Sequence, residues 1–223
     1  VAVRLAKGED VYVTADQAAI VEILGPPQHE KEVVERQPTV GVSAGLSWSP
    51  SGGDLMFIES MRMSGKGQVE LAGQMGEVMK ESAAAAFTYV RARAKTFGLD
   101  ADFLSKIDVH VHLPQGGIPK DGPSAGIAIL VSLVSMLTNI KVRPDVAMTG
   151  EITLRGNVLR IGGLKDKCLA AHRAGVRHVI MPKVNEAEQE DVPKEVRAEL
   201  EIHLVSRVDE ALAIALERMP TAG

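Results

Sequence analysis

The sequence predicts an α+β (mixed α/β) domain, and three observations support this fold class. Short segments with strand-like composition are interleaved with longer helical segments, but without the strict repetition of a doubly wound sheet. Hydrophobic residues make up 45% of the 223 residues, which is enough to bury a core. One segment, residues 124–137, is almost wholly apolar, as expected of a buried central helix.

Charge and cysteine content exclude several classes of protein. The net charge of −4 gives no overall attraction to nucleic acid, and aromatic residues, at 3%, offer few surfaces for base stacking. The longest apolar run, residues 127–137, is interrupted by Ser132 and Ser135 and is too short to cross a membrane. The single cysteine, Cys168, cannot form an internal disulfide, so we expect a reducing, cytoplasmic setting.

Residues 1–38 form a separate opening piece in this interpretation. Residues 11–14 have strand propensity, and Thr14 is a suitable N-cap for a helix over residues 15–24 that a glycine and two prolines end. The polar residues 28–37 that follow are typical of a linker. Because this piece is too small to hold its own core, we expect it to be the end of a preceding module.

The next part of the chain predicts two strands and a long helix. A strand interrupted by glycines is expected over residues 40–48, followed by turn residues and a second strand over residues 54–60. A long helix is expected from residue 73 or 75 to Phe97, where Gly98 supplies the usual end signal. This part opens the main domain.

The remaining elements alternate between strands and helices. Residues 107–113 alternate with a period of two, and a loop rich in glycine and proline leads from them into the buried helix. Further elements are expected in this order: a strand at 146–149, a hairpin of 152–154 and 158–161, a helix at 164–174, a strand at 179–181, an acidic helical stretch, a strand at 202–205 and a helix at 209–217. We therefore place the main domain at residues 39–217 and a tail at residues 218–223.

Ser124 is the first candidate for chemistry. Gly122 or Asp121 can serve as N-cap of the buried helix, and Pro123 suits its first turn, so Ser124 is expected in that turn. Free backbone N–H groups and the positive end of the helix dipole gather there and could stabilise an oxyanion. The alternative is a serine that only caps the helix.

A nucleophilic serine needs a base, and two lysines compete for this role. At about 100° per residue, Lys167 falls in the apolar arc of its helix with Leu164 and Cys168, whereas Lys165 falls outside it. Burial would lower the pKa of a lysine by roughly 2–3 units, toward the operating pH. The alternative is that Lys167 reaches the surface or pairs with a carboxylate. Combined with Ser124, catalysis is the interpretation we prefer.

Other side chains are weaker candidates. Asp121 could orient the loop, restrain the base or simply cap a helix, and Thr149 could hydrogen-bond a neutral lysine or merely end a strand. His110 and His112 face the same side of a strand, but no further ligand lies at a convincing spacing, so we expect a structural pair and no metal. Cys168 lies on the buried arc and is expected in the core.

Six segments across most of the main domain match one family pattern. They are residues 52–55, 76–82, 110–112, 119–126, 148–156 and 161–167. In combination they resemble the C-terminal proteolytic domain of Lon, the ATP-dependent protease. The resemblance implies a Ser–Lys dyad at Ser124 and Lys167, whose spacing (167 − 124 = 43) is the one the family pattern requires. It also implies a supporting role for Thr149, and Asp121 and Gly122 lie inside the matching loop.

The resemblance has further implications for partners and cofactors. It implies a homohexameric ring that encloses a proteolytic chamber, and unfolded proteins as substrates. Residues 1–38 resemble the last strand and helix of the family's ATPase module, and ATP and Mg²⁺ are implied for that module. No phosphate loop is present, since Gly162 and Gly163 are not followed by Gly-Lys-Ser/Thr, so we expect no cofactor in this chain.

The function expected from these observations is that of a serine endopeptidase acting on unfolded or damaged proteins. Ser124 would attack the scissile carbonyl, and Lys167 would accept the proton and return it to the leaving amine. One alternative is a non-catalytic, ring-forming assembly module of the same fold, which the presence of both dyad members disfavours. Another is a Ser–Lys amidase for small amides, but no convincing motif supplies its second serine.

Overall fold

The computed structural model describes residues 6–8, 16–25, 37–100, 102–114 and 120–220. The chain divides into two compact units, Val1–Glu32 and Val33–Gly223. In the first unit, α2 (Gln17–Leu24) is capped at its start by Asp16, whose carboxylate accepts a hydrogen bond from the Ala19 amide, and at its end by Gly25. The helix therefore starts two residues later than expected. The strand expected at residues 11–14, its cap Thr14 and most of the linker lie outside the described residues.

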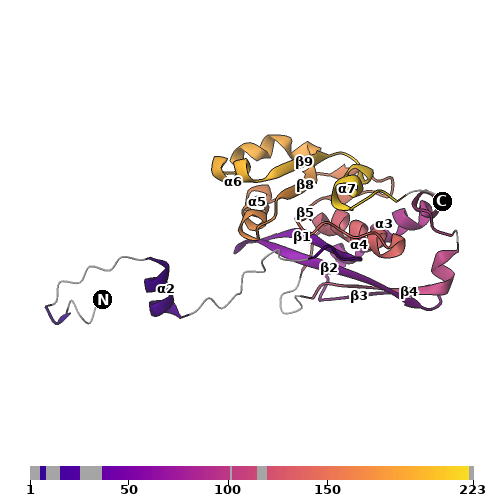
Figure 1. Ribbon diagram of the computed structural model, residues 1–223, viewed down its shortest axis with the longest axis horizontal. Coiled ribbons are helices and arrows are strands. Elements are labelled where there is room, and N and C mark those ends of the chain that lie inside the picture. The colour runs from indigo at the N-terminus through magenta and orange to yellow at the C-terminus, as the bar shows by residue number, and fades with distance from the viewer. Residues whose placement is uncertain (1–5, 9–15, 26–36, 101, 115–119, 221–223) are drawn as a thin grey trace. The chain divides into compact units, whose positions relative to one another are not determined.

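The second unit is built on a seven-stranded mixed sheet, which confirms the expected fold class (Figure 1). The strands follow the order β3-β4-β2-β1-β5-β8-β9. The pairs β4–β2 and β2–β1 are antiparallel, whereas β3–β4, β1–β5, β5–β8 and β8–β9 are parallel. The bounds are β1 (Val42–Ser49), β2 (Gly52–Ser64), β3 (Val69–Ala72), β4 (Ile107–His112), β5 (Val146–Met148), β8 (His178–Pro182) and β9 (Glu201–Val205).

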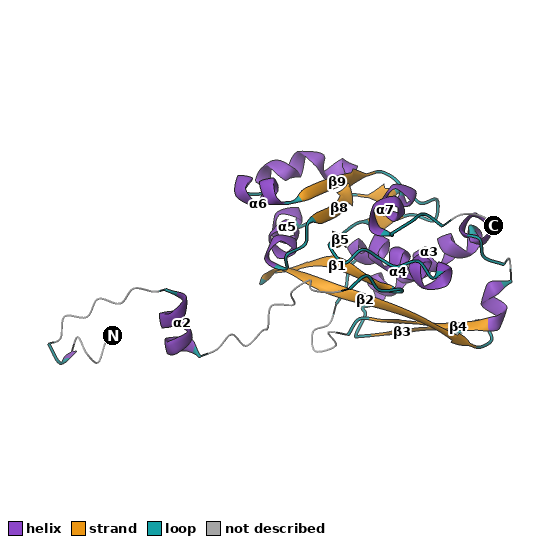
Figure 2. Ribbon diagram, in the orientation of Figure 1, coloured by secondary structure: helices purple, strands orange, loops and turns teal. Residues whose placement is uncertain are grey.

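Helices cover this sheet on both faces (Figure 2). They are α3 (Glu77–Ala92), α4 (Gly126–Thr138), α5 (Leu164–Arg173), α6 (Lys194–Glu199) and α7 (Val208–Ala215). Alternate residues of β2 show the two faces: Met56 and Ile58 pack in the core formed with α3, α4 and α7, whereas Leu55 and Phe57 pack in the core formed with α5 and α6. Both faces are apolar because both are buried.

The apolar segment is the buried helix that the sequence predicts. Every residue from 126 to 137 is buried in α4. The two serines that interrupt it are hydrogen-bonded: Ser132 Oγ donates to the Gly41 carbonyl at 2.7 Å, and Ser135 Oγ donates to the Ile140 carbonyl. These bonds satisfy hydroxyls that would otherwise be costly to bury. No helix in the described part of the chain has the length and apolarity that a membrane crossing requires.

Several element boundaries differ from the sequence expectations. The helix expected up to Phe97 is α3, which ends at Ala92 and is followed by a 3-10 turn, Ala94–Phe97, closed by Gly98 in the left-handed conformation. The strand expected over residues 54–60 is the longer β2. The edge strand β3 and a 3-10 turn, Phe103–Lys106, were not predicted, because β3 is short, contains no buried residue and has no strong apolar pattern.

The last third of the unit follows the expected order more closely. The hairpin consists of β6 (Glu151–Ile152) and β7 (Val158–Leu159), which pair antiparallel. The acidic helical stretch is a 3-10 segment, Lys183–Asp191, followed by α6. The expected helix over residues 164–174 is α5, and the expected final helix is α7.

Candidate active site

Ser124 lies in the 3-10 turn Pro123–Ala125 that leads directly into α4. Gly122 is the N-cap of this turn, and Pro123 occupies its first position, as the sequence indicates. The Gly126 amide, at the C-terminal end of the turn, donates to the Pro123 carbonyl, and Ser124 lies in the first turn, before the hydrogen bonds of α4 begin. The serine hydroxyl therefore stands at the positive end of a buried helix.

Lys167 enters the same place from α5. Its side chain is buried, with 2% of its surface exposed, whereas Lys165 two residues earlier is exposed. The prediction that Lys167 lies on the buried face of this helix and Lys165 outside it is therefore confirmed. Cys168, the next residue, is also buried, and burial raises the pKa of its thiol to about 11, so it is not a reactive thiolate.

Three polar side chains meet at the amine. Lys167 Nζ lies 3.1 Å from Ser124 Oγ and 2.9 Å from Thr149 Oγ1. Thr149 is fully buried just after β5, and its hydroxyl lies 3.4 Å from the Ser124 carbonyl oxygen. If the threonine proton is donated to that carbonyl, Thr149 Oγ1 accepts from a lysine N–H, and this directs the amine toward the serine.

The position of Ser124 relative to Thr149 is set by the backbone. The Gly150 amide donates to the Ser124 carbonyl at 2.8 Å, and the Ile127 amide donates to the Gly150 carbonyl at 3.1 Å. These two bonds tie the start of α4 to the chain just after β5. The serine and the threonine are therefore held by the fold itself, and only the lysine arrives on a separate helix.

Burial alone shifts the ionisation of the amine. Loss of solvent lowers the pKa of Lys167 from its ordinary value of 10.5 to about 8. Its hydrogen-bond partners are the two hydroxyls, and among the described residues no carboxylate forms an ion pair with it. A neutral form is thus accessible near neutral pH, as a general base requires.

Asp121 has a structural contact that the sequence does not reveal. Its Oδ1 accepts hydrogen bonds from the Met79 amide at 3.0 Å and from the Gly122 amide at 2.9 Å. Met79 is the third residue of α3, so Asp121 caps that helix from a distance of 42 positions in sequence. It does not cap the helix that it precedes. Gly122 has φ +130°, a value that favours glycine.

The start of α5 is packed against the β1–β2 hairpin. A side chain at Gly53 would place its Cβ 2.0 Å from the Asp166 carbonyl oxygen, so only glycine permits this approach. Trp48 Nε1 donates to the Asp166 carboxylate at 2.9 Å, and Arg173 donates to the Gly53 carbonyl at 2.7 Å. These contacts position the helix that carries Lys167.

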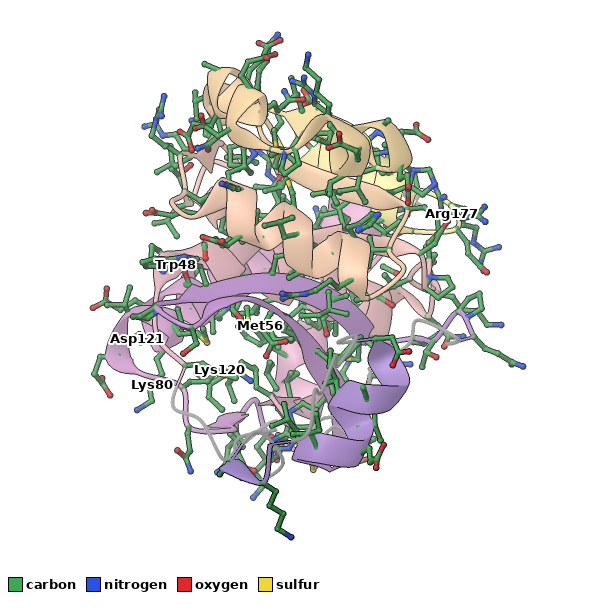
Figure 3. All side chains as sticks on the ribbon, turned by 90° about the vertical axis from the view of Figure 1, so that its left-hand side faces the viewer. Trp48, Met56, Lys80, Lys120, Asp121 and Arg177 are labelled. Atoms are coloured by element: carbon green, nitrogen blue, oxygen red, sulfur yellow. The ribbon has the colours of Figure 1, made fainter. Side chains whose placement is uncertain are left out.

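A cleft of about 600 Å³ opens over the serine and the lysine. Its apolar lining includes Met56, Met79 and Ile161, and Trp48, which is 55% exposed, stands at its edge. Figure 3 shows Trp48, Lys120 and Asp121 on one side of the molecule, with Arg177 on the opposite side. The cleft is large enough to receive several residues of an extended chain.

The remaining sequence candidates lie elsewhere. His110 is on β4 with its Nδ1 3.2 Å from a Glu70 carboxylate oxygen, and the His110 and His112 rings meet edge to face. No third metal-ligating side chain joins them among the described residues. The structural role that the sequence favours for this pair stays a prediction.

Three contacts of the structure were not predicted. These are the capping of α3 by Asp121, the bond between Trp48 and Asp166, and a cluster of two histidines and a glutamate on β8 and β9. The spacing Glu-x-His in the last strand is a weak signal for the cluster, because residues two apart share one face of a strand. The other two contacts carry no local signal.

Comparison with known proteins identifies the family. A family model described as the Lon protease (S16) C-terminal proteolytic domain matches residues 14–218. The chain belongs to this family. It is 50% identical over 223 residues to a Lon protease of Anaeromyxobacter dehalogenans, covering 99% of this chain and 26% of that protein.

Other Lon relatives agree with this assignment. A Lon protease of Chloroflexus aggregans is 53% identical over 206 residues, covering 92% of this chain and 25% of the relative. The peroxisomal Lon protease homolog 2 of Danio rerio is 50% identical over 216 residues, covering 96% of this chain and 26% of that protein. The chain therefore spans about a quarter of the length of these Lon proteases.

Proposed function

We propose that the chain is the serine endopeptidase domain of a Lon-type protease, with Ser124 as nucleophile and Lys167 as general base. The observation that carries the proposal is the 3.1 Å separation of Lys167 Nζ and Ser124 Oγ in a buried site whose amine has a lowered pKa. A nucleophile within hydrogen-bond reach of a base that a third group orients is the arrangement covalent catalysis needs. Thr149 is the orienting group.

The first half of the proposed reaction forms an ester. Ser124 Oγ attacks the scissile carbonyl carbon while its proton moves to the lone pair of neutral Lys167. The backbone amides at the start of the turn donate to the oxyanion that develops. The carbon–nitrogen bond then breaks, the Lys167 ammonium returns the proton to the leaving amine, and the acyl group stays on Ser124.

The second half releases the product. A water molecule attacks the ester carbonyl and gives its proton to Lys167. The carbon–oxygen bond to Ser124 then breaks, and Lys167 returns the proton to the serine oxygen, so the site is restored. The amine thus alternates between neutral and charged forms, and its environment must tolerate both, as two hydroxyl partners allow.

The substrate in this proposal is an unfolded or damaged polypeptide. The cleft is lined by apolar side chains over the dyad, with charged groups at Lys120, Asp121 and Arg160. An extended peptide could add to the site through backbone hydrogen bonds while its side chains occupy this lining. Such binding favours chains that have lost their own secondary structure.

The wider assembly is also part of the proposal. We infer a cytoplasmic homohexameric ring in which an ATPase module, with ATP and Mg²⁺, delivers substrates to this domain. The support is the membership of the Lon family, whose relatives are about four times as long as this chain. Sizing the purified chain, alone and joined to an ATPase module, tests the ring.

The experiment for the proposed activity uses the purified 223-residue chain. A reduced and alkylated protein and a short fluorogenic peptide serve as substrates, and a peptide boronate serves as a probe of the serine. We expect cleavage and boronate labelling with the natural chain, and neither with Ser124→Ala. Cleavage by Ser124→Ala at the natural rate would refute the assignment of Ser124 as the nucleophile. If the boronate labels the natural chain in no assembly state, the non-catalytic, ring-forming module is favoured instead.

A further inference from the structure

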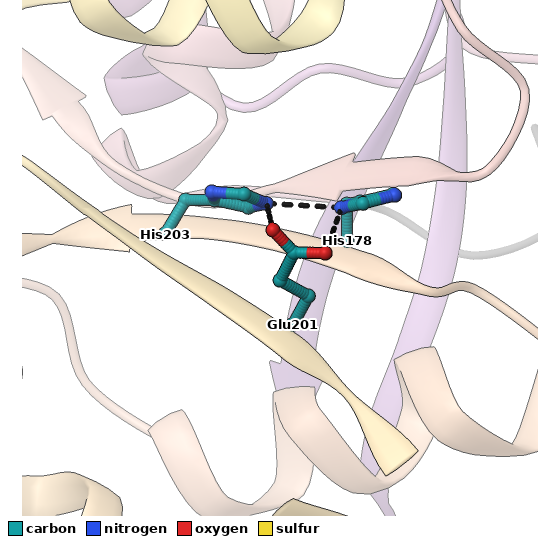
Figure 4. A group of neighbouring side chains, drawn as sticks. All are labelled: His178, Glu201 and His203. Carbon is teal, nitrogen blue, oxygen red and sulfur yellow. Dashed lines mark hydrogen bonds and ion pairs between the residues drawn. The ribbon is translucent and has the colours of Figure 1, made fainter.

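Two histidines and a glutamate gather on one face of the sheet at its edge (Figure 4). His178 begins β8, and Glu201 and His203 lie on β9, the last strand of the sheet. In the parallel register His178 faces Glu201, and His203 lies two positions further along the same strand. The three side chains therefore share a face because of the period of a strand.

The donor atoms of these side chains already have the spacing of metal ligands. His178 Nδ1 lies 3.0 Å from His203 Nε2 and 3.3 Å from a Glu201 carboxylate oxygen, and His203 Nε2 lies 3.6 Å from the other oxygen. Ligands bound tetrahedrally to Zn²⁺ at about 2.0–2.1 Å are about 3.3 Å from one another. Shifts of a few tenths of an ångström would bring the three donor atoms to the spacing of three ligands around one tetrahedral Zn²⁺.

A further carboxylate lies beside the outer nitrogen of one ring. Asp145 Oδ2 lies 3.4 Å from His178 Nε2, and Arg143 holds Asp145 at 3.1 Å. A neutral imidazole carries one proton, and when that proton is on Nε2, the nitrogen nearer Asp145, the Nδ1 lone pair faces Glu201 and His203. A carboxylate bound to the outer nitrogen of a histidine is the usual support of a metal ligand.

The arrangement leaves two acceptors facing one another. A bare His178 Nδ1 and a Glu201 oxygen cannot hydrogen-bond to each other, and a cation between them satisfies both. Without a metal, a His203 that carries its proton on Nε2 can donate it to His178 Nδ1 at 3.0 Å, and this hydrogen-bonded pair is the metal-free alternative. Two imidazole nitrogens and one carboxylate suit Zn²⁺, whereas Mg²⁺ and Ca²⁺ prefer oxygen ligands.

We propose that His178, Glu201 and His203 bind a zinc ion that fastens the edge strand β9 to β8. The site is distant from the dyad: Arg177, which precedes His178, lies on the opposite side of the molecule from Trp48 and Asp121 (Figure 3). Beyond β9, the Ser206 carbonyl accepts from the Val158 amide, so the strand also supports the β6–β7 hairpin. The ion is therefore assigned to stability and not to peptide cleavage.

The test is zinc titration of the full 223-residue chain after removal of metals by a chelator. We expect saturable binding near one ion per chain by calorimetry, an intense visible absorption with Co²⁺ in place of zinc, and no binding of Mg²⁺ in the same range. At a hundredfold excess over Kd, zinc is expected to raise the Tm by roughly 5–10 °C. Absence of saturable binding would overturn the site in favour of a metal-free, hydrogen-bonded histidine pair.

Variants connect the binding to these side chains. His203→Ala and the milder Glu201→Gln each remove a proposed ligand, so zinc binding should weaken by at least the roughly 10–100-fold that loss of an outer-shell partner costs. The matched control is His172→Ala, which removes a histidine that also pairs with a glutamate, Glu199, at 2.8 Å, but on α5. Unchanged zinc affinity in both Glu201→Gln and His203→Ala would refute the assignment, and so would an equal loss of affinity in His172→Ala. Circular dichroism checks that each variant is folded.

Discussion

Lys167 Nζ is 2.9 Å from Thr149 Oγ1, slightly closer than its 3.1 Å to Ser124 Oγ. The amine is thus held by a residue that is fully buried, while the serine hydroxyl is the partner nearer the cleft. A base positioned in this way can give up its contact with the serine during the reaction without losing its place.

The two lysines of α5 should differ strongly in their effect on activity. Lys167→Met removes the proposed base and keeps an apolar side chain of similar length, and we expect peptide cleavage to fall roughly a thousandfold. Lys165→Met alters an exposed side chain and should change the rate by less than about threefold. Initial rates on a fluorogenic peptide measure both, and the reverse ranking would show that the base is wrongly assigned.

Activity should rise with pH in the range where the amine loses its proton. Because the lone pair of neutral Lys167 is needed and its pKa is about 8, kcat should increase as pH rises through about 8 and level off above it. At pH 7 only about a tenth of the sites would be neutral. A pH–rate profile between pH 6 and 10 measures the midpoint, and a profile that falls across this range would contradict the role of a neutral lysine.

The same shift in pKa makes stability depend on pH. The pKa of Lys167 is lowered to about 8 in the folded chain and is about 10.5 when unfolded, so between these values the unfolded chain binds the extra proton. The free energy of unfolding should therefore rise with pH from about 8 to 10.5, by at most about 3 kcal/mol from this group. Below pH 8 the free-energy cost of burying the charged Lys167 ammonium is fully present.

Denaturant unfolding at pH 7 and pH 10 isolates that contribution. Lys167→Met should be more stable than the natural chain at pH 7, and the difference should shrink at pH 10, because the substitution removes the buried charge. Lys165→Met is the control, since its amine is exposed. An equal effect of both substitutions at the two pH values would argue against a buried, destabilised ammonium.

Thr149 should act on the ionisation of the lysine. Thr149→Val keeps the shape but removes the hydroxyl that accepts from Lys167, and an ammonium loses more from this than a neutral amine does. We expect kcat to fall about 10–100-fold and the midpoint of the pH–rate profile to move to lower pH. Thr149→Ser should restore both. A lower rate with an unchanged midpoint would leave Thr149 with a packing role only.

Asp121 should matter for stability through α3. Asp121→Ala removes the acceptor for the Met79 and Gly122 amides and should lower the free energy of unfolding by about 1–2 kcal/mol. Asp121→Asn keeps an acceptor oxygen and should cost less. Denaturant midpoints with unchanged slopes would measure the difference, and equal costs for the two substitutions would contradict capping.

Much of the fold was predictable because the signals are local. The apolar composition of α4, the alternation in β4 and the glycines after α2 and α5 each act within a few residues of the element they define. Boundaries were less predictable where a distant residue decides them. Asp121, which caps α3 from another loop, is the clearest example, and the short edge strand β3 is another.

Local patterns in the sequence were enough to place a serine at the start of a buried helix and to place Lys167, not Lys165, on the apolar arc of another helix. The three-dimensional arrangement was needed to show that these groups meet at 3.1 Å, that Thr149 Oγ1 lies 2.9 Å from the same amine, and that His178 lies beside Glu201 and His203. The reason is physical. Helical periodicity and capping are properties of neighbouring residues, whereas contact between distant segments depends on sheet order, register and the close packing of α5 on β2.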